Sequence, residues 1–175
     1  LPGYLYPEVN QRKTYPAQSL IFPFGGNASQ FQAVENALNH QLSVIQGPPG
    51  TGKTQTILNI IANLLIRGQT VQVVSNNNSA TQNVLEKLSS PKYRMDFLVA
   101  SLGKRENKAA FVKNQTGRYP NIAEWKLERE YMAELQQKID GYSAELRRHF
   151  GKQERLAVAR RELSELEVER GHFEQ

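Results

Sequence analysis

One stretch of the sequence, GPPGTGKT from Gly47 to Thr54, has the residue types and the spacing to bind a phosphate. It matches the pattern G-x-x-x-x-G-K-[ST] at every fixed position. In such a loop, glycines let the backbone amides close around a β-phosphate, the lysine neutralises β/γ charge and the hydroxyl ligates Mg²⁺. Lys53 and Thr54 are therefore the candidate catalytic residues, and Thr54 is the candidate Mg²⁺ ligand. The candidate nucleotide-binding residues here are Gly47, Pro48, Pro49, Gly50, Thr51, Gly52, Lys53, Thr54 and Gln55.

The segments on either side of this stretch predict the elements that must position it. Residues 42–46, LSVIQ, are short, apolar and β-branched, which predicts a buried strand. Residues 54–67 are apolar around most of a helical circumference and are followed by Gly68, which predicts a buried helix with a glycine stop. A loop between a strand and a helix lets the helix N-terminus face an anion. We therefore expect the stretch to bind the phosphates of a nucleotide.

The same alternation of strand and helix continues along the chain. Residues 70–75 and 96–102 predict two further strands, and residues 79–88 predict a helix between them. Upstream, apolar residues at three- and four-residue steps predict a helix with Ser29 as its N-cap. Strands that alternate with helices at this spacing indicate right-handed βαβ units. We therefore expect an α/β fold, a partial P-loop NTPase parallel sheet with flanking helices.

The last third of the chain has a different composition. Residues 123–170 are dominated by Glu, Lys, Arg, Leu, Ala and Gln, and Gly151 interrupts them. This predicts either one long interrupted helix or two helices that turn near residues 150–152. The chain is thus divided into an irregular lead-in (1–26), an α/β unit (27–118) and a helical arm (119–175). A three-and-four spacing typical of a coiled coil or helical hairpin, which could support self-association, links Met132, Leu135, Ile139, Tyr142 and Leu146.

Composition excludes several other classes of protein. The chain has no cysteine, so a disulfide framework and a thiolate metal site are impossible, and its three histidines lack ligand spacing. No apolar run approaches the roughly 20 residues of a membrane helix, and the first residues lack a signal-peptide pattern. We expect a cytoplasmic location and no membrane partner. Residues 87–118 carry 8 basic and 2 acidic residues, which indicates either contact with phosphate backbones or a solvated basic loop.

Hydrolysis of a bound nucleotide requires more than the loop. It also needs an acidic residue at a strand end for Mg²⁺ and water, and usually an arginine that acts on the transition state. Between Thr54 and Gly117 the acidic residues are Glu86, Asp96 and Glu106, and none of them is expected at the end of a strand. We therefore expect the 175-residue chain to bind nucleotide without efficient hydrolysis.

Three segments resemble superfamily 1 helicases, in the branch that contains the nonsense-mediated-decay RNA helicase. Those proteins read L-N-x-S-Q, x-x-A-V and I-Q-G-P-P-G-T-G-K-T, where this chain reads GNASQ, FQAVENAL and LSVIQGPPGTGKT. The resemblance implies that Gln30 hydrogen-bonds adenine and favours ATP, with Asn27 as the asparagine before it. VVSNNNSATQNVLEKL resembles the family's motif Ia, which implies contact of Asn76, Asn77, Asn78 and Ser79 with a single nucleic-acid strand.

FLVASLGKRENK more loosely resembles the strand that follows in the family, and residues 123–170 are similar to its helical stalk. The resemblance implies the front of a RecA-like domain that binds ATP or ADP with Mg²⁺, in a piece of a longer helicase or translocase of DNA or RNA. Two other readings stay open. One is a P-loop phosphotransferase, and the other is a non-enzymatic coiled-coil oligomerisation module with a vestigial P-loop.

Overall fold

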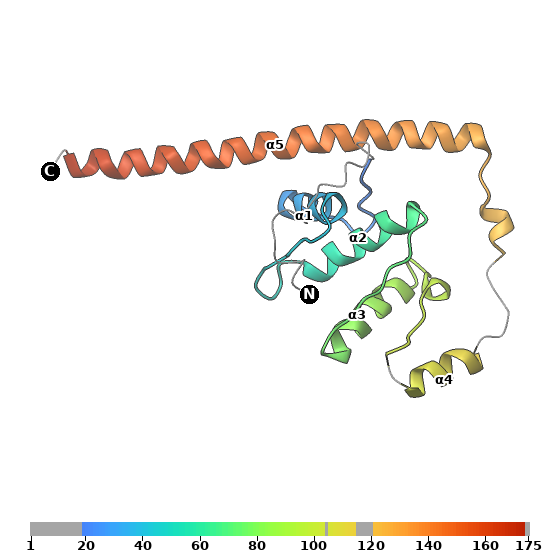
Figure 1. Ribbon diagram of the computed structural model, residues 1–175. Helices are drawn as coiled ribbons and strands as arrows, with labels where there is room; N and C mark the ends of the chain where they lie inside the picture. The colour runs from blue at the N-terminus through green and yellow to red at the C-terminus, as the bar shows by residue number, and fades with distance from the viewer. Residues whose placement is uncertain (1–18, 104, 115–120, 174–175) are drawn as a thin grey trace.

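The structure is a computed structural model that describes residues 19–103, 105–114 and 121–173. Figure 1 shows the longest helix, α5, lying across α1 and α2 and running on beyond them, with α3 and α4 on the side away from α5. The elements are α1 (Ala28–Asn39), α2 (Lys53–Ile66), α3 (Asn78–Ser89), the 3₁₀ helix η3 (Asp96–Leu98), α4 (Arg105–Asn114), the 3₁₀ helix η4 (Ile122–Trp125) and α5 (Arg129–Phe173).

Helix α1 begins at a capping box. The side chain of Asn27 accepts a hydrogen bond from the Gln30 backbone N–H at 2.9 Å, and the Gln30 side chain accepts one from the Asn27 N–H at 2.9 Å. Two N–H groups that the helix cannot satisfy itself are thereby paired. The prediction of this helix is confirmed, but the prediction of Ser29 as its N-cap is wrong. The reciprocal pairing three residues apart favours Asn27.

Helices α2 and α3 lie within one or two residues of their predicted bounds. Helix α2 ends in a Schellman motif, in which the N–H of Gln69 bonds to the Leu64 carbonyl (3.0 Å) and that of Gly68 to the Leu65 carbonyl (2.9 Å). Gly68 has φ +68°, a left-handed conformation that glycine adopts without strain. The predicted glycine stop is therefore confirmed.

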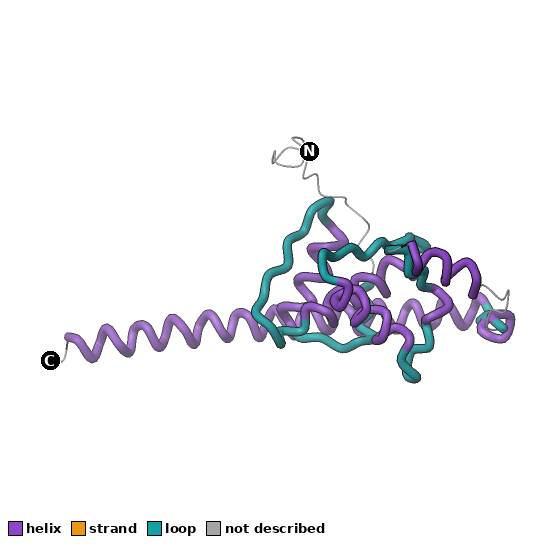
Figure 2. The backbone as a smooth tube through the Cα atoms, turned by 90° about the horizontal axis from the view of Figure 1, so that it is seen from below, coloured by secondary structure: helices purple, strands orange, loops and turns teal. Residues whose placement is uncertain are grey.

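The described residues contain no β-strand, and Figure 2 draws them as helices and loops alone. Residues 42–46 and 70–75 are loops, and residues 96–102 begin as the 3₁₀ helix η3. At these three segments the structure therefore differs from the predicted strands, and the predicted sheet remains unconfirmed. A strand exists only where a neighbouring strand pairs with its backbone. The sequence shows that these segments are apolar but not whether a partner strand covers them, and Val44 and Val74 are 75% and 77% exposed.

Helix α2 lies between two apolar clusters, one shared with α1 and one with α3. The lead-in contributes to both, so its described part belongs to the core. The cluster on the α1 side contains Leu20, Phe31, Val34 and Leu38, with Phe22, Ile60, Leu64 and Phe150 packed against it. The cluster on the α3 side contains Leu58, Ile61, Val84 and Leu88, with Phe24, Met95 and Val99 packed against it.

Helix α5 is one uninterrupted helix of 45 residues, roughly 68 Å long at 1.5 Å per residue. Of the two alternatives left by the sequence, the structure therefore has the single helix, without a turn near Gly151. A glycine inside a helix costs about 1 kcal/mol relative to alanine, and the strong helix formers around Gly151 tolerate it. The coiled-coil partner remains unconfirmed, because Met132, Tyr142 and Leu146 are exposed.

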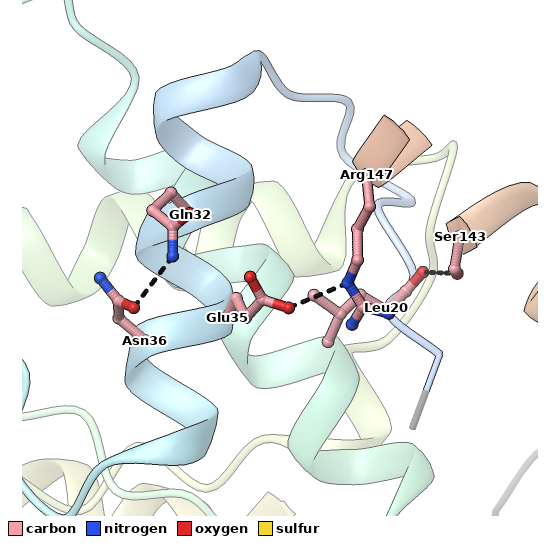
Figure 3. A network of polar contacts seen from close by, with 6 residues as sticks. All are labelled: Leu20, Gln32, Glu35, Asn36, Ser143 and Arg147. Atoms are coloured by element: carbon pink, nitrogen blue, oxygen red, sulfur yellow. Dashed lines mark hydrogen bonds and ion pairs between the residues drawn. The ribbon is translucent and has the colours of Figure 1, made fainter. Parts of the chain in front are cut away.

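A short stretch near the middle of α5 contacts the rest of the molecule. The Ser143 hydroxyl donates to the Leu20 carbonyl at 2.9 Å, and the Arg147 guanidinium donates to the Glu35 carboxylate at 2.9 Å. Figure 3 shows both contacts beneath the helix. Ser143 is the one buried side chain of α5 in the described range 129–173. None of the described helices combines the length and the apolar character needed to cross a membrane.

Candidate nucleotide-binding site

The loop 47–52 depends on its glycines for its shape. Gly50 and Gly52 have φ +86° and +81°, a left-handed conformation that L side chains rarely adopt. A Cβ on Gly47 would lie 2.5 Å from Thr51 Oγ1, and one on Gly52 would lie 2.1 Å from Gln30 Nε2. Side chains at these positions would therefore collide with the loop itself or with α1.

The lysine of the loop lies at its rim. Lys53 Nζ donates to the carbonyl oxygens of Gly47 (2.5 Å) and Pro48 (2.8 Å), and Thr51 Oγ1 also donates to Pro48 O (2.8 Å). These acceptors are neutral carbonyls. A phosphate oxygen is a stronger acceptor for an ammonium group. The ammonium is thus positioned beside the loop on partners that a phosphate can replace.

The start of α2 offers further groups to an anion. Gly52 is its N-cap, has no side chain to cap the helix and is followed by no acidic residue in the first turn. The first backbone N–H groups of a helix lack intrahelical partners and carry partial positive charge. Thr54 is half-buried in this same turn. Lys53, Thr54 and the first-turn amides therefore fit a nucleotide phosphate.

The chain offers Mg²⁺ few ligands of its own. Within the described ranges, no group of three or more His, Asp or Glu side chains is arranged to hold a metal ion. Thr54, half-buried in the first turn of α2, carries a hydroxyl of the kind that ligates Mg²⁺, and Mg²⁺ commonly binds through one or two protein oxygens together with substrate phosphates. The arrangement is compatible with Mg²⁺ that arrives with a nucleotide.

Gln30 reaches the phosphate loop from α1. Its side chain is 7% exposed, and its Nε2 lies within hydrogen-bond distance of Gly52 O (3.2 Å), Thr51 O (3.4 Å) and Gln55 Oε1 (3.2 Å). Its Oε1 accepts from the Asn27 N–H. The structure therefore brings Gln30 together with three predicted site residues that are far from it in the sequence, Thr51, Gly52 and Gln55. The contact of Gln30 with adenine stays a prediction.

Two buried amides of α2 were not predicted as part of this region. Asn63 binds the backbone of Ile21 at both ends, donating to its carbonyl (2.8 Å) and accepting from its N–H (3.0 Å). Asn59, fully buried, accepts from the N–H of Phe24 (3.2 Å) and donates to the carbonyl of Gly25 (2.7 Å). The segment 20–25 is thereby held along α2.

Gln55 is the third member of this amide series, at four-residue steps before Asn59 and Asn63. Its Nε2 donates to the carbonyl of Phe24, and its Oε1 accepts from Gln30 Nε2. The side chain of Gln55 therefore faces α1 and the segment 20–25. The signal in the sequence was the i, i+4, i+8 spacing of amides on one face of an otherwise apolar helix, because buried amides need partners.

The predicted nucleic-acid residues lie at the start of α3. Asn77 is the N-cap, and its side-chain oxygen accepts from the Ser79 N–H and hydroxyl, both at 2.9 Å. Asn76, Asn78 and Ser79 are exposed around it. The capping role of Asn77 is established by this geometry. Contact of the four residues with a nucleic-acid strand remains a prediction.

A glycine-rich loop that closes on the N-terminus of a helix, with a lysine at its rim, defines a P-loop nucleotide-binding protein. The chain belongs to the AAA domain family, which matches residues 25–174, and its relatives place it among superfamily 1 helicases of the nonsense-mediated-decay branch. This confirms the resemblance seen in the sequence. No solved structure matches the chain significantly.

The similar proteins carry the names of helicases, of a DNA-binding protein and of regulators of nonsense transcripts. The chain is 45% identical over 65 residues to the DNA polymerase alpha-associated DNA helicase A of Schizosaccharomyces pombe (37% of this chain, 10% of the relative). It is 48% identical over 63 residues to the Regulator of nonsense transcripts 1 homolog of Drosophila melanogaster (35% and 5%). It is 41% identical over 68 residues to mouse DNA-binding protein SMUBP-2 (38% and 7%). The chain thus spans a tenth or less of the length of these relatives.

Proposed function

We propose that this chain is the ATP-binding portion of an ATP-dependent superfamily 1 helicase or translocase that acts on single-stranded DNA or RNA. The observation that supports this best is a contact between α1 and the phosphate loop. Gln30 Nε2, on α1, donates to the Gly52 carbonyl at the N-terminus of α2. Lys53 and Thr54 hold the phosphates and Mg²⁺, and Gln30 recognises adenine. A phosphotransferase has no need of a glutamine at this place, so the helicase family and this contact together favour the helicase.

The test is a titration of the chain with a fluorescent ADP analogue in Mg²⁺, with ATP and GTP as competitors. We expect saturable binding that is displaced better by ATP than by GTP and that is lost in Lys53→Ala. Lys87→Ala removes an exposed lysine from α3 and serves as the matched control. Equal binding by wild type and Lys53→Ala contradicts the proposal, provided that both proteins have the same melting temperature.

We also propose that this chain alone turns over almost no ATP. Glu86, Asp96 and Glu106 are exposed, and no hydrogen bond links any of them to Lys53 or Thr54 in the described structure. Phosphate release from ATP that is no faster with the chain than in buffer alone supports this proposal. Release that is many times faster, and that is abolished by Lys53→Ala, contradicts it.

The α/β sheet is proposed on the strength of the family and of the exposed valines. Val44, Val71, Val73 and Val74 lie in the two loops 42–46 and 70–75, and valine favours the half-buried surface of a sheet. We propose that these segments pair as parallel strands in solution. An infrared amide I band typical of a sheet supports the pairing, whereas a spectrum of helix and coil alone contradicts it.

A second candidate function is self-association through α5. Leu156, Leu163, Leu166 and Phe173 are exposed and recur at steps of seven, three and seven along the C-terminal part of the helix. This is coiled-coil spacing, and the proposed occupant is a second copy of the chain. Sedimentation that yields a dimer for wild type and a monomer for Leu163→Glu supports it, and a wild-type monomer at high micromolar concentration contradicts it.

The expected cytoplasmic location stays a prediction.

A further inference from the structure

Two glutamine side chains connect a backbone carbonyl to a backbone N–H beside the phosphate loop. Gln55 Nε2 donates to the carbonyl of Phe24, and Gln55 Oε1 accepts from Gln30 Nε2 at 3.2 Å. Gln30 Oε1 then accepts from the N–H of Asn27 at 2.9 Å. The series has Phe24 O at one end and Asn27 N–H at the other.

The polarity of the two end groups fixes the orientation of both amides. A backbone carbonyl only accepts, and a backbone N–H only donates. Gln55 must therefore present its NH₂ to Phe24 and its oxygen to Gln30, and Gln30 must present its NH₂ to Gln55 and its oxygen to Asn27. If either amide were reversed, two donors or two acceptors would face each other in a part-buried place.

Other contacts keep the Phe24 end of the series in position. Asn59, fully buried, accepts from the N–H of Phe24 and donates to the carbonyl of Gly25. Asn63 binds both backbone groups of Ile21. The carbonyl that orients Gln55 therefore belongs to a segment that is itself held on α2.

The orientation of the Gln30 amide matters for recognition of a base. A carbonyl oxygen has two lone pairs, and Asn27 N–H uses one of those on Gln30 Oε1. Adenine presents an N6 amino donor, whereas guanine presents an O6 acceptor at the corresponding place. The second lone pair of Gln30 Oε1 would therefore match the amino donor of adenine and oppose the O6 acceptor of guanine.

We propose that Gln55 is a positioning residue that, together with the Thr51 and Gly52 carbonyls, holds the Gln30 amide and thereby contributes to the preference of the site for adenine over guanine. This inference rests on the proposed function, because it requires the loop to bind a nucleotide. Gln55 itself contacts Phe24 and Gln30, and it acts on the base through Gln30. We therefore expect Gln55 to affect the choice between adenine and guanine, while phosphate binding depends on Lys53 and the loop.

Two substitutions at this position separate orientation from stability. Gln55→Met keeps the length of the side chain but removes both the donor and the acceptor. Gln55→Glu keeps an acceptor for Gln30 Nε2, but a carboxylate has no donor for the Phe24 carbonyl. The matched control is Gln32→Met on the exposed face of α1, where the Gln32 side chain donates a hydrogen bond to Asn36.

The experiment measures the dissociation constants of fluorescent ADP and GDP analogues for the 175-residue chain and its variants, together with their melting temperatures. We expect the GDP-to-ADP ratio of dissociation constants to fall by about fivefold in Gln55→Met, the effect of about one neutral hydrogen bond. The ratio should stay within about twofold of wild type in Gln55→Glu and in Gln32→Met. The melting temperature should be lowest in Gln55→Glu, whose carboxylate faces a carbonyl.

The inference is supported if Gln55→Met has the lower GDP-to-ADP ratio of dissociation constants while Gln55→Glu has the lower melting temperature. A ratio that is unchanged in Gln55→Met, or that falls in both variants in step with the melting temperature, overturns the inference. Wild type that binds both analogues equally, with binding lost in Lys53→Ala, also overturns it but leaves phosphate binding intact. Wild type that binds neither analogue overturns the inference and the proposed function together.

Discussion

The guanidinium of Arg147 lies 2.9 Å from the carboxylate of Glu35 and joins the middle of α5 to α1. It also lies 5.9 Å from the centre of the Phe31 ring. Both charged side chains are partly screened by solvent, so the pair contributes modestly. We predict that Arg147→Met lowers the free energy of unfolding by about 1 kcal/mol, measured by urea denaturation.

A double-mutant cycle with Glu35→Gln separates the ion pair from the packing of Arg147 on Phe31. Arg161→Met provides the control, because Arg161 pairs with Glu165 on the exposed surface of α5. We expect no resolvable change in the unfolding free energy for that variant. Equal losses at Arg147 and Arg161 would mean that the contact of α5 with α1 adds nothing to stability.

The buried amide of Asn59 should matter more than this ion pair. Asn59→Ala leaves the N–H of Phe24 and the carbonyl of Gly25 without their partner. An unsatisfied buried polar group costs about 1–3 kcal/mol, so we predict a loss of about 3 kcal/mol in unfolding free energy, measured in urea. Asn36→Ala, which removes an exposed amide from α1, should change it by less than about 0.5 kcal/mol. Similar values for the two variants would contradict a structural role for the α2 amides.

The helices beside the loop could be predicted from the sequence because each has a local cause. Apolar periodicity predicts α1, α2 and α3, and Gly68 marks the end of α2 through its own backbone conformation. The three expected strands lack such a local cause, since a strand depends on a partner elsewhere in the chain, and the described residues contain no strand. The contacts of Asn59 with residues 24 and 25 also join distant segments, and the sequence shows only that amides recur along α2.

The α5 helix illustrates a different limit. Gly151 is a valid stop signal in a short helix, but the many helix-forming residues on both sides of it outweigh a cost of about 1 kcal/mol. The docking of α5 through Ser143 could not be predicted either. A single serine on a charged helix carries no periodic signal, and its partner, the Leu20 carbonyl, is a backbone group.

The glycines of the phosphate loop should differ in their sensitivity to substitution. A Cβ on Gly52 would lie 2.1 Å from Gln30 Nε2, and the residue also has a positive φ. Gly50 has a positive φ but open space around the position of a Cβ. We predict that Gly52→Ala weakens binding of the fluorescent ADP analogue more than Gly50→Ala, which costs about 1 kcal/mol of stability.

Gly103→Ala is the control for these two variants, because Gly103 has neither a positive φ nor any atom near the position of a Cβ. Its melting temperature and nucleotide affinity should equal those of wild type. If Gly50→Ala and Gly52→Ala weaken binding equally, backbone conformation alone explains the requirement for glycine. The contact between Gln30 and the loop would then have no part in it.

The asparagines at the start of α3 allow capping to be separated from nucleic-acid contact. Asn77 accepts from the Ser79 N–H, so Asn77→Ala should lower the unfolding free energy by about 1 kcal/mol. Asn76→Ala, which leaves this cap intact, should leave stability unchanged. Short polar side chains at a helix start suit contact with a phosphate backbone, so Asn76→Ala should weaken binding of a fluorescein-labelled single-stranded oligonucleotide, measured by anisotropy at fixed salt. Weaker binding in Asn77→Ala alone would assign the asparagine run to capping.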